Sequence, residues 1–187
     1  MVLAFLRAER RGLNAAWVEH AVAADPGLLD NPQLDDEAEN ARRVDVLQPF
    51  RGYKASPGEH PYIFAGFPTD VEWWEGLQSR DDIEDLYYGR EQWSEVTAAH
   101  GRQVRNVAPL VHELASPTRE TVAAIEEAIR AGEDLEPLIV CSTGPEGRHV
   151  LLEGYKRATA YARVLEPETE VRALIGYSNA MESWLFF

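Results

Sequence analysis

The chain has 187 residues, of which 45% are apolar, and its 32 acidic and 18 basic residues give a net charge of −14. Such acidity argues against nucleic acid as a partner, because that binding depends on Lys and Arg neutralising phosphates. The single cysteine, Cys141, excludes an intrachain disulfide, and no apolar stretch approaches the roughly 20 residues of a membrane span. We therefore expect a cytoplasmic protein with no membrane partner, while composition leaves the oligomeric state open.

The first part of the chain is predicted to be mostly helical. Apolar residues at helical spacing predict one or two amphipathic helices over residues 3–24 and another over 34–50. The segment 51–68, rich in glycine and proline, is predicted to be a long ordered loop. Residues 69–72 have the pattern of a capping box, which predicts a short helix that ends near Gln78.

The middle of the chain continues with helical patterns. A further helix is predicted to begin at Ser79 and extend to residue 97, and another to occupy residues 104–114 after a break at Gly101. The strongest helical signal lies between residues 116 and 132, because Pro stands near its start and one apolar stripe runs along it to a glycine.

After residue 132 the apolar pattern changes from a helical period to short runs that are typical of strands. The expected order is a buried strand (138–141), a turn (143–147), a second strand (149–152), a glycine (154), a helix (156–165) and a final strand (171–175). Cys141 is thus predicted to be buried and inert. The expected fold class is α/β (α+β) with a small mixed sheet, in which a helical region 1–103 packs on an α/β core 104–187 as one compact unit.

The residues that follow the second predicted strand form a candidate anion site. The stretch from Glu153 to Arg157 leads through a glycine into a helix, so first-turn amides and the positive end of the helix dipole meet there. Gly154 would let a ligand approach the backbone, and Lys156 and Arg157 would supply two cationic donors. Thr159 would add a hydroxyl, and Glu153 is placed to hold a metal, a hydroxyl or a proton. The alternative is an ordinary turn before a solvated basic helix.

This order of elements resembles the ParB/sulfiredoxin-like superfamily over about residues 116–176. The superfamily has a Gly-x-x-Arg-x-x-Ala signature, which Gly154, Arg157 and Ala160 match position by position. The resemblance implies nucleotide phosphates bound at this loop and helix start, with ATP or another NTP as cofactor, with or without Mg²⁺. Tyr155, a further candidate contact in the loop, stands where sulfiredoxins carry a reactive cysteine, so reductase chemistry is disfavoured.

Members that act as serine kinases carry Asp-Gly-His-His-Arg at this loop, and the present chain keeps the acid, the glycine and the arginine. Such kinases also have a His-Glu pair before the long helix, and His112-Glu113 stands in a comparable place. The candidate catalytic residues are therefore Glu153, Glu113 and Lys156, since phosphoryl transfer needs mainly positioning and charge neutralisation. The alternative for Glu113 is an ordinary place on an amphipathic helix.

The N-terminal region supplies candidate substrate-binding residues, namely Arg43, Arg51, Tyr53 and Asp70. They would converge over the loop to select a small-molecule substrate, although such arginines more often pair with local acids. No P-loop, Rossmann or nucleophile-elbow motif occurs, and the five histidines have no metal-ligand spacing, so no metal site is expected. Two functions remain: a phosphotransferase or NTPase, and a non-enzymatic ligand-binding or regulatory protein that keeps the fold without catalysis.

Overall fold

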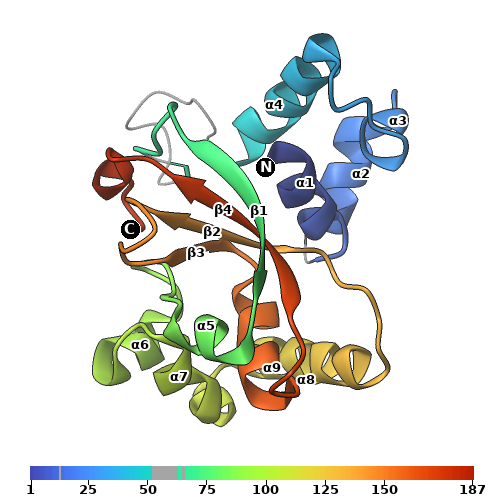
Figure 1. Cartoon of the computed structure of the whole chain (residues 1–187). Helices are drawn as coiled ribbons and strands as arrows, with labels where there is room; N and C mark the ends of the chain where they lie inside the picture. Colours follow the sequence, from blue (N-terminus) through green and yellow to red (C-terminus); the bar gives the residue numbers. More distant parts are fainter. Residues whose placement is uncertain (13, 52–62, 65) are drawn as a thin grey trace. The chain divides into compact units, whose positions relative to one another are not determined.

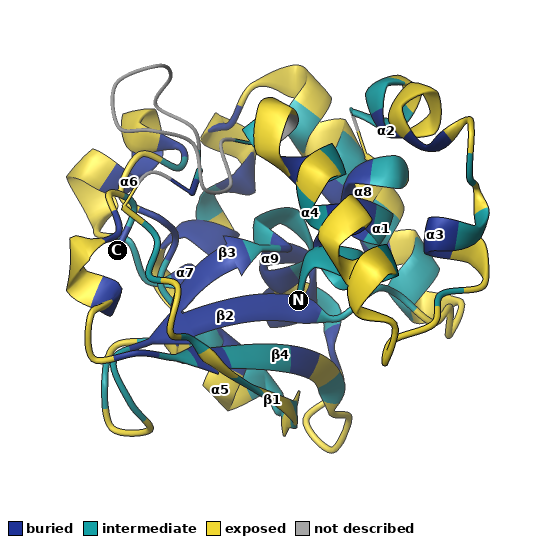
Figure 2. Ribbon diagram, turned by 90° about the horizontal axis from the view of Figure 1, so that it is seen from above, coloured by how far each residue is buried: buried dark blue, intermediate teal, exposed yellow. Residues whose placement is uncertain are grey.

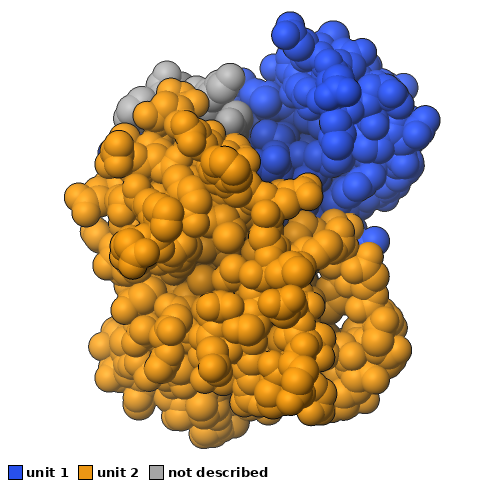
Figure 3. All heavy atoms as spheres, viewed as in Figure 1, with its two compact units in different colours: residues 1–67, 183–185 blue, residues 68–182, 186–187 orange. Residues whose placement is uncertain are grey.

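The computed structural model describes residues 1–12, 14–51, 63–64 and 66–187 (Figure 1). The chain forms two compact units, one of Met1–Phe67 with Ser183–Leu185 and one of Pro68–Glu182 with Phe186–Phe187 (Figure 3). The division follows Phe67, whereas the sequence analysis placed a boundary after residue 103 and expected one compact unit. Residues 68–103 belong to the second unit because they contain a strand of its sheet.

The first unit is helical, as expected, with a core of buried apolar side chains. Its helices are α1 (Val2–Arg10), α2 (Ala15–Val22), α3 (Gly27–Asp30) and α4 (Glu37–Arg51). A row of aromatic rings links Phe5 to Phe64, Phe64 to Phe67 and Phe67 to Trp184, with centroids 5.3, 5.3 and 5.5 Å apart. These ring contacts hold the late segment Ser183–Leu185 in this unit.

The second unit is built on a four-stranded mixed sheet in the order β1-β4-β2-β3. Its strands are β1 (Glu72–Gln78), β2 (Leu138–Ser142), β3 (Val150–Glu153) and β4 (Val171–Tyr177). The predicted hairpin of β2 and β3 is confirmed, and β4 lies parallel to β2. All five residues of β2 are buried, as Figure 2 shows in dark blue. The small mixed sheet and the helices around it confirm the α+β prediction.

The helix predicted after residue 69 is wrong, because this segment forms the edge strand β1. It pairs antiparallel with β4 along its whole length, from Glu72 opposite Tyr177 to Gln78 opposite Val171. Aromatic residues such as Trp73 favour strands, and pairing with β4 outweighs a four-residue capping pattern. A real capping box lies one element later, where Ser79 and Asp82 cap the start of α5.

The predicted helix from Ser79 to residue 97 is interrupted in the middle. The helices of this unit are α5 (Arg80–Asp85), α6 (Ser94–His100), α7 (Val104–Val107), η1 (Ala108–Glu113), α8 (Ser116–Arg130) and α9 (Tyr155–Val164). The short helix η2 (Met181–Ser183) begins in this unit, and its last residue belongs to the first. Tyr87 breaks the helix because its backbone bonds to the outer edge of β3: its N–H donates to His149 O at 2.8 Å, and its carbonyl accepts from Leu151 N at 2.8 Å. This bridge brings the α5 end beside the start of β3.

The core of the second unit lies between the sheet and its helices. Helix α9 packs against β2 and α8, and the fully buried members of this core include Val122, Val140 and Ala158. The predicted apolar stripe of α8 faces this core, with Ile125 and Ile129 partly buried against it. Within the described part of the chain, none of the helices has the length and apolar character needed to cross a membrane.

Candidate functional site

Gly154 forms the turn between β3 and α9, where the sequence analysis placed the anion site. It is the N-cap of α9 and has a φ of +95°, a left-handed conformation that L-residues with a side chain rarely adopt. A Cβ at this position would lie 2.7 Å from Leu138 Cδ2 and 3.0 Å from Arg157 Nη2. Glycine is therefore required both by the backbone conformation and by the packing of the arginine three residues later.

Arg157 is directed towards the strand ends and is largely buried. Its Nη2 donates to Pro137 O at 3.3 Å and lies 3.7 Å from Glu153 Oε1, and its side chain is 13% exposed. Its Nε is buried and has no hydrogen-bond acceptor among the residues that the structure describes. A buried guanidinium N–H without an acceptor is unfavourable by about 1–3 kcal/mol. Gly154 and Arg157 thus pack tightly together, and the Nε–H of Arg157 is a donor without an acceptor among the described residues.

The first turn of α9 has an unusual charge for a helix start. It contains Lys156 and Arg157 and no acidic residue. A helix N-terminus favours negative charge by about 0.3–1 kcal/mol per group, so two cations there oppose the helix dipole. Glu153 precedes the turn, and its carboxylate oxygen Oε1 lies 3.7 Å from Arg157 Nη2. This turn therefore remains a candidate anion site, as the sequence predicted.

Two other predicted contacts, Tyr155 and Thr159, take part in the packing of α9. The ring of Tyr155 stands edge-on to Trp93 with centroids 5.2 Å apart. Thr159 is fully buried, and its hydroxyl bonds to Tyr88 Oη and to Tyr155 O, both at 2.7 Å. The hydroxyl of Thr159 is therefore engaged inside the protein and does not face solvent.

The predicted His-Glu pair lies at the end of η1 on the surface. Glu113 is 3.8 Å from His112 Nε2, and their side chains are 43% and 74% exposed. The exposure of both side chains favours the alternative, in which Glu113 is an ordinary surface residue of an amphipathic segment.

The two predicted substrate-binding arginines lie in the first unit. Arg43 is fully buried, donates to Leu28 O at 2.8 Å and forms an ion pair with Glu39. Arg51 forms an ion pair with Glu9. Both follow the alternative given above, in which arginines pair with local acids and stabilise the helices around them.

Of the remaining substrate-binding candidates, Tyr53 lies outside the described residues. Asp70 precedes β1 in the second unit, where it accepts a hydrogen bond from Ser178 Oγ at 2.8 Å. That bond joins the start of β1 to the end of β4 and gives Asp70 a role in the sheet.

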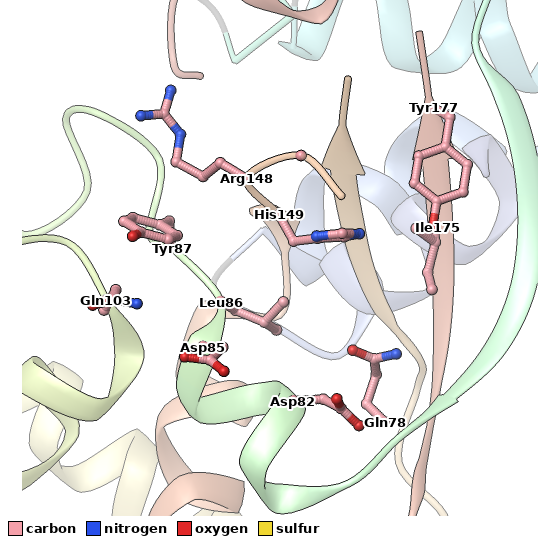
Figure 4. Close-up of a pocket in the computed structure, with 11 residues that line it drawn as sticks. Gln78, Asp82, Asp85, Leu86, Tyr87, Gln103, Arg148, His149, Ile175 and Tyr177 are labelled. Atoms are coloured by element: carbon pink, nitrogen blue, oxygen red, sulfur yellow. The ribbon is translucent and has the colours of Figure 1, made fainter. Parts of the chain in front are cut away.

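A cavity of about 370 Å³ lies in the second unit, at the start of β3 (Figure 4). The polar side chains that line it include Gln78, Asp82, Tyr87, Gln103, His149 and Tyr177. Its volume is within the usual range for small-molecule sites, which is about 300–1,000 Å³. The residues come from β1, α5, β4 and three loops, so sequence spacing alone gave no sign of this cavity.

His149 is the titratable group in this cavity with a shifted pKa. Burial lowers the pKa of its imidazole, while a hydrogen bond with the Gly147 backbone and the charge of Asp82 act in the opposite direction. The ring is edge-on to Tyr177, with centroids 6.0 Å apart. From sequence, His149 is predicted as the first residue of a strand and has no metal-ligand spacing with the other histidines, and neither signal points to a cavity.

A second cavity of about 470 Å³ in the same unit is rich in arginine. Its arginines are Arg80, Arg105, Arg130 and Arg163. Each of them already forms an ion pair with a nearby carboxylate. The cavity therefore has no excess of unpaired positive charge to attract an anion.

No protein-family model, curated protein or solved structure matches the chain. The ParB/sulfiredoxin-like assignment therefore stays a prediction from the residues around Gly154. Among the described residues, no group of three or more His, Cys, Asp or Glu side chains gathers in a way that could hold a metal ion. A divalent ion at the loop would thus need ligand oxygens in addition to a protein group such as Glu153.

Proposed function

We propose that the protein binds a phosphorylated small molecule, such as ATP or another NTP with or without Mg²⁺, at the first turn of α9. The observation that carries this proposal is the buried Nε–H of Arg157, which has no acceptor among the described residues and lies at the positive end of a ten-residue helix. A hydrogen bond between a guanidinium and a phosphate contributes about 1.5–3 kcal/mol. The proposal includes a cytoplasmic location, where such nucleotides occur.

In this proposal the charges of the loop have separate roles. Lys156 and the helix dipole attract the phosphate, and Arg157 donates to one of its oxygens. Glu153, 3.7 Å from Arg157, would be released from this contact to hold Mg²⁺ or to accept a proton from a substrate hydroxyl. A transferase or NTPase reaction would use Glu153 and Lys156, with Glu113 as a second candidate acid or base.

A non-enzymatic binding or regulatory protein is the second candidate. It is favoured by the inward direction of Arg157 and by the buried hydroxyl of Thr159, because both groups already have structural partners. In this role the ligand would stabilise the β3–α9 turn without any change to its phosphates.

The experiment measures the thermal stability of the protein and, by titration calorimetry, its affinity for ATP, ADP, CTP, GTP and inorganic phosphate, with and without Mg²⁺. Lys156→Gln should weaken binding at least severalfold, because it removes a cation at the helix start. The matched control is Arg172→Gln, which also removes one positive charge but at a residue whose partner is the exposed Asp134. Wild-type protein that binds none of these compounds would overturn the proposal, and binding without turnover would favour the regulatory role.

A further inference from the structure

The His149 cavity is separate from the loop at Gly154, although one strand joins them. His149 immediately precedes β3 and Gly154 immediately follows it. With a rise of about 3.3 Å per residue, the four residues of β3 place the two sites roughly 15 Å apart. A single small ligand at the helix start would therefore leave the cavity available to another molecule.

The carboxylates that line the cavity have hydrogen-bond or ion-pair partners within the protein. Asp82 Oδ2 accepts from Ser79 N at 2.9 Å and Ser79 Oγ at 2.6 Å, as part of the capping box of α5. Asp85 forms an ion pair with Arg105. Both carboxylates are therefore engaged, and the negative charge of Asp82 makes the cavity unfavourable for an anionic ligand.

Arg148 does not add a cation to the interior of this cavity. Its guanidinium lies over the rings of Tyr87 and Phe187, with distances of 5.7 and 4.7 Å to the ring centroids. Figure 4 shows that it extends away from His149. These cation–π contacts occupy the guanidinium and hold the loop before β3 in place.

The groups that remain are neutral and can form hydrogen bonds. They are the amides of Gln78 and Gln103, the phenol groups of Tyr87 and Tyr177, and the imidazole of His149. Figure 4 shows the imidazole extended from its loop towards β4, with Gln78 and Asp82 on the same side of the cavity. Donors and acceptors on several walls match a molecule that itself carries hydroxyl groups on several sides.

We propose that this cavity is a binding site for a small uncharged polyhydroxyl molecule, of the monosaccharide or cyclitol class, and that His149 accepts a hydrogen bond from one of its hydroxyl groups. Amides and phenols bond to the other hydroxyls, and the apolar faces of Leu86 and Ile175 contact the carbon skeleton. A phosphate would be a poorer ligand here, because Asp82 and Asp85 line the same space.

The protonation state of His149 supports the role of acceptor. Burial lowers the pKa of the imidazole, so the neutral ring predominates at pH 7. The groups that face it are Asp82, the Gly147 backbone and the ring of Tyr177. The Gly147 backbone raises this pKa as a partner of the imidazole N–H, and the other nitrogen of the neutral ring is the one that can accept a bond from a ligand. Protonation in acid converts that acceptor to a donor, which would reverse the direction of the hydrogen bond with the hydroxyl group.

The test uses glucose and myo-inositol as probes with the full-length protein, and detects binding by saturation-transfer NMR and by the imidazole resonances of ¹³C,¹⁵N-histidine. We expect saturation transfer to at least one probe and a shift of the His149 signals. His149→Leu should lower affinity about tenfold, which corresponds to one hydrogen bond of about 1.4 kcal/mol. His149→Gln should recover part of it by keeping a polar side chain, and Gln78→Ala, at the end of β1, should also weaken binding.

His100→Gln is the matched control, since His100 is an exposed histidine at the end of α6. Absence of saturation transfer to both probes in folded wild type would overturn the proposal, as would equal binding by wild type, His149→Leu and Gln78→Ala. The result is independent of the phosphate site: Lys156→Gln should leave sugar binding unchanged, and His149→Leu should leave nucleotide binding unchanged.

Discussion

Replacement of Gly154 by alanine tests the claim that the Gly-x-x-Arg turn is a tightly packed unit. The left-handed φ of +95° costs an L-residue about 1–2 kcal/mol. The new Cβ would also lie 2.7 Å from Leu138 Cδ2, and overpacking of this kind costs about 1–3 kcal/mol. Gly154→Ala should therefore lower the free energy of unfolding by about 2–5 kcal/mol.

Two other glycines separate these contributions. Gly132 has a φ of +74° but no atom within 4 Å of an added Cβ, so Gly132→Ala should cost only the conformational part, about 1–2 kcal/mol. Gly144 has open space and no left-handed φ, so Gly144→Ala should leave stability unchanged or raise it by up to about 1 kcal/mol.

The assay is urea denaturation of all three variants, followed by circular dichroism and tryptophan fluorescence so that separate transitions of the two units are detected. From the most to the least stable, the variants should rank Gly144→Ala, Gly132→Ala and Gly154→Ala. Equal losses for Gly132→Ala and Gly154→Ala would refute the reasoning, because they would show that the contacts with Leu138 and Arg157 impose no penalty of their own.

Three further predictions concern buried groups of the second unit. Glu126→Gln should lower stability by about 1–2 kcal/mol in thermal denaturation, because the carboxylate is 2.5 Å from Arg163 and only 11% exposed; no loss would show that the pair contributes nothing. Burial raises the pKa of the Cys141 thiol, so it should react with Ellman's reagent only after denaturation, and rapid native reaction would contradict its burial. Burial also raises the pKa of Tyr88 above its ordinary value of 10.0, so its stabilisation is present below pH 10 and lost as the pH rises through the folded value. Tyr88→Phe should therefore reduce the loss of unfolding free energy as the pH rises above 10. At pH 7 it should lower that free energy by about 0.5–1.5 kcal/mol, because the bond to Thr159 is lost. An equal dependence of stability on pH in wild type and variant above pH 10 would contradict this.

The sequence was sufficient for features that depend on neighbouring residues. The hairpin of β2 and β3, the start of α9 after Gly154 and the burial of Cys141 follow from short apolar runs, a glycine and a helical period, and all three are confirmed. Each of these signals lies within about ten residues of the element it predicts, so no distant contact was needed.

Only the tertiary structure decided the features that join distant parts of the chain. Strand β1 owes its conformation to pairing with β4, about 100 residues later, and this pairing overrode a local helix signal. The inward direction of Arg157 depends on Pro137 O, and the cavity at His149 depends on β1, α5, β4 and three loops that meet at one end of β3. The place of the candidate anion site, between β3 and α9, could therefore be predicted from sequence. The direction of its side chains could not, because the backbone pattern determines position along an element and packing determines what each side chain reaches.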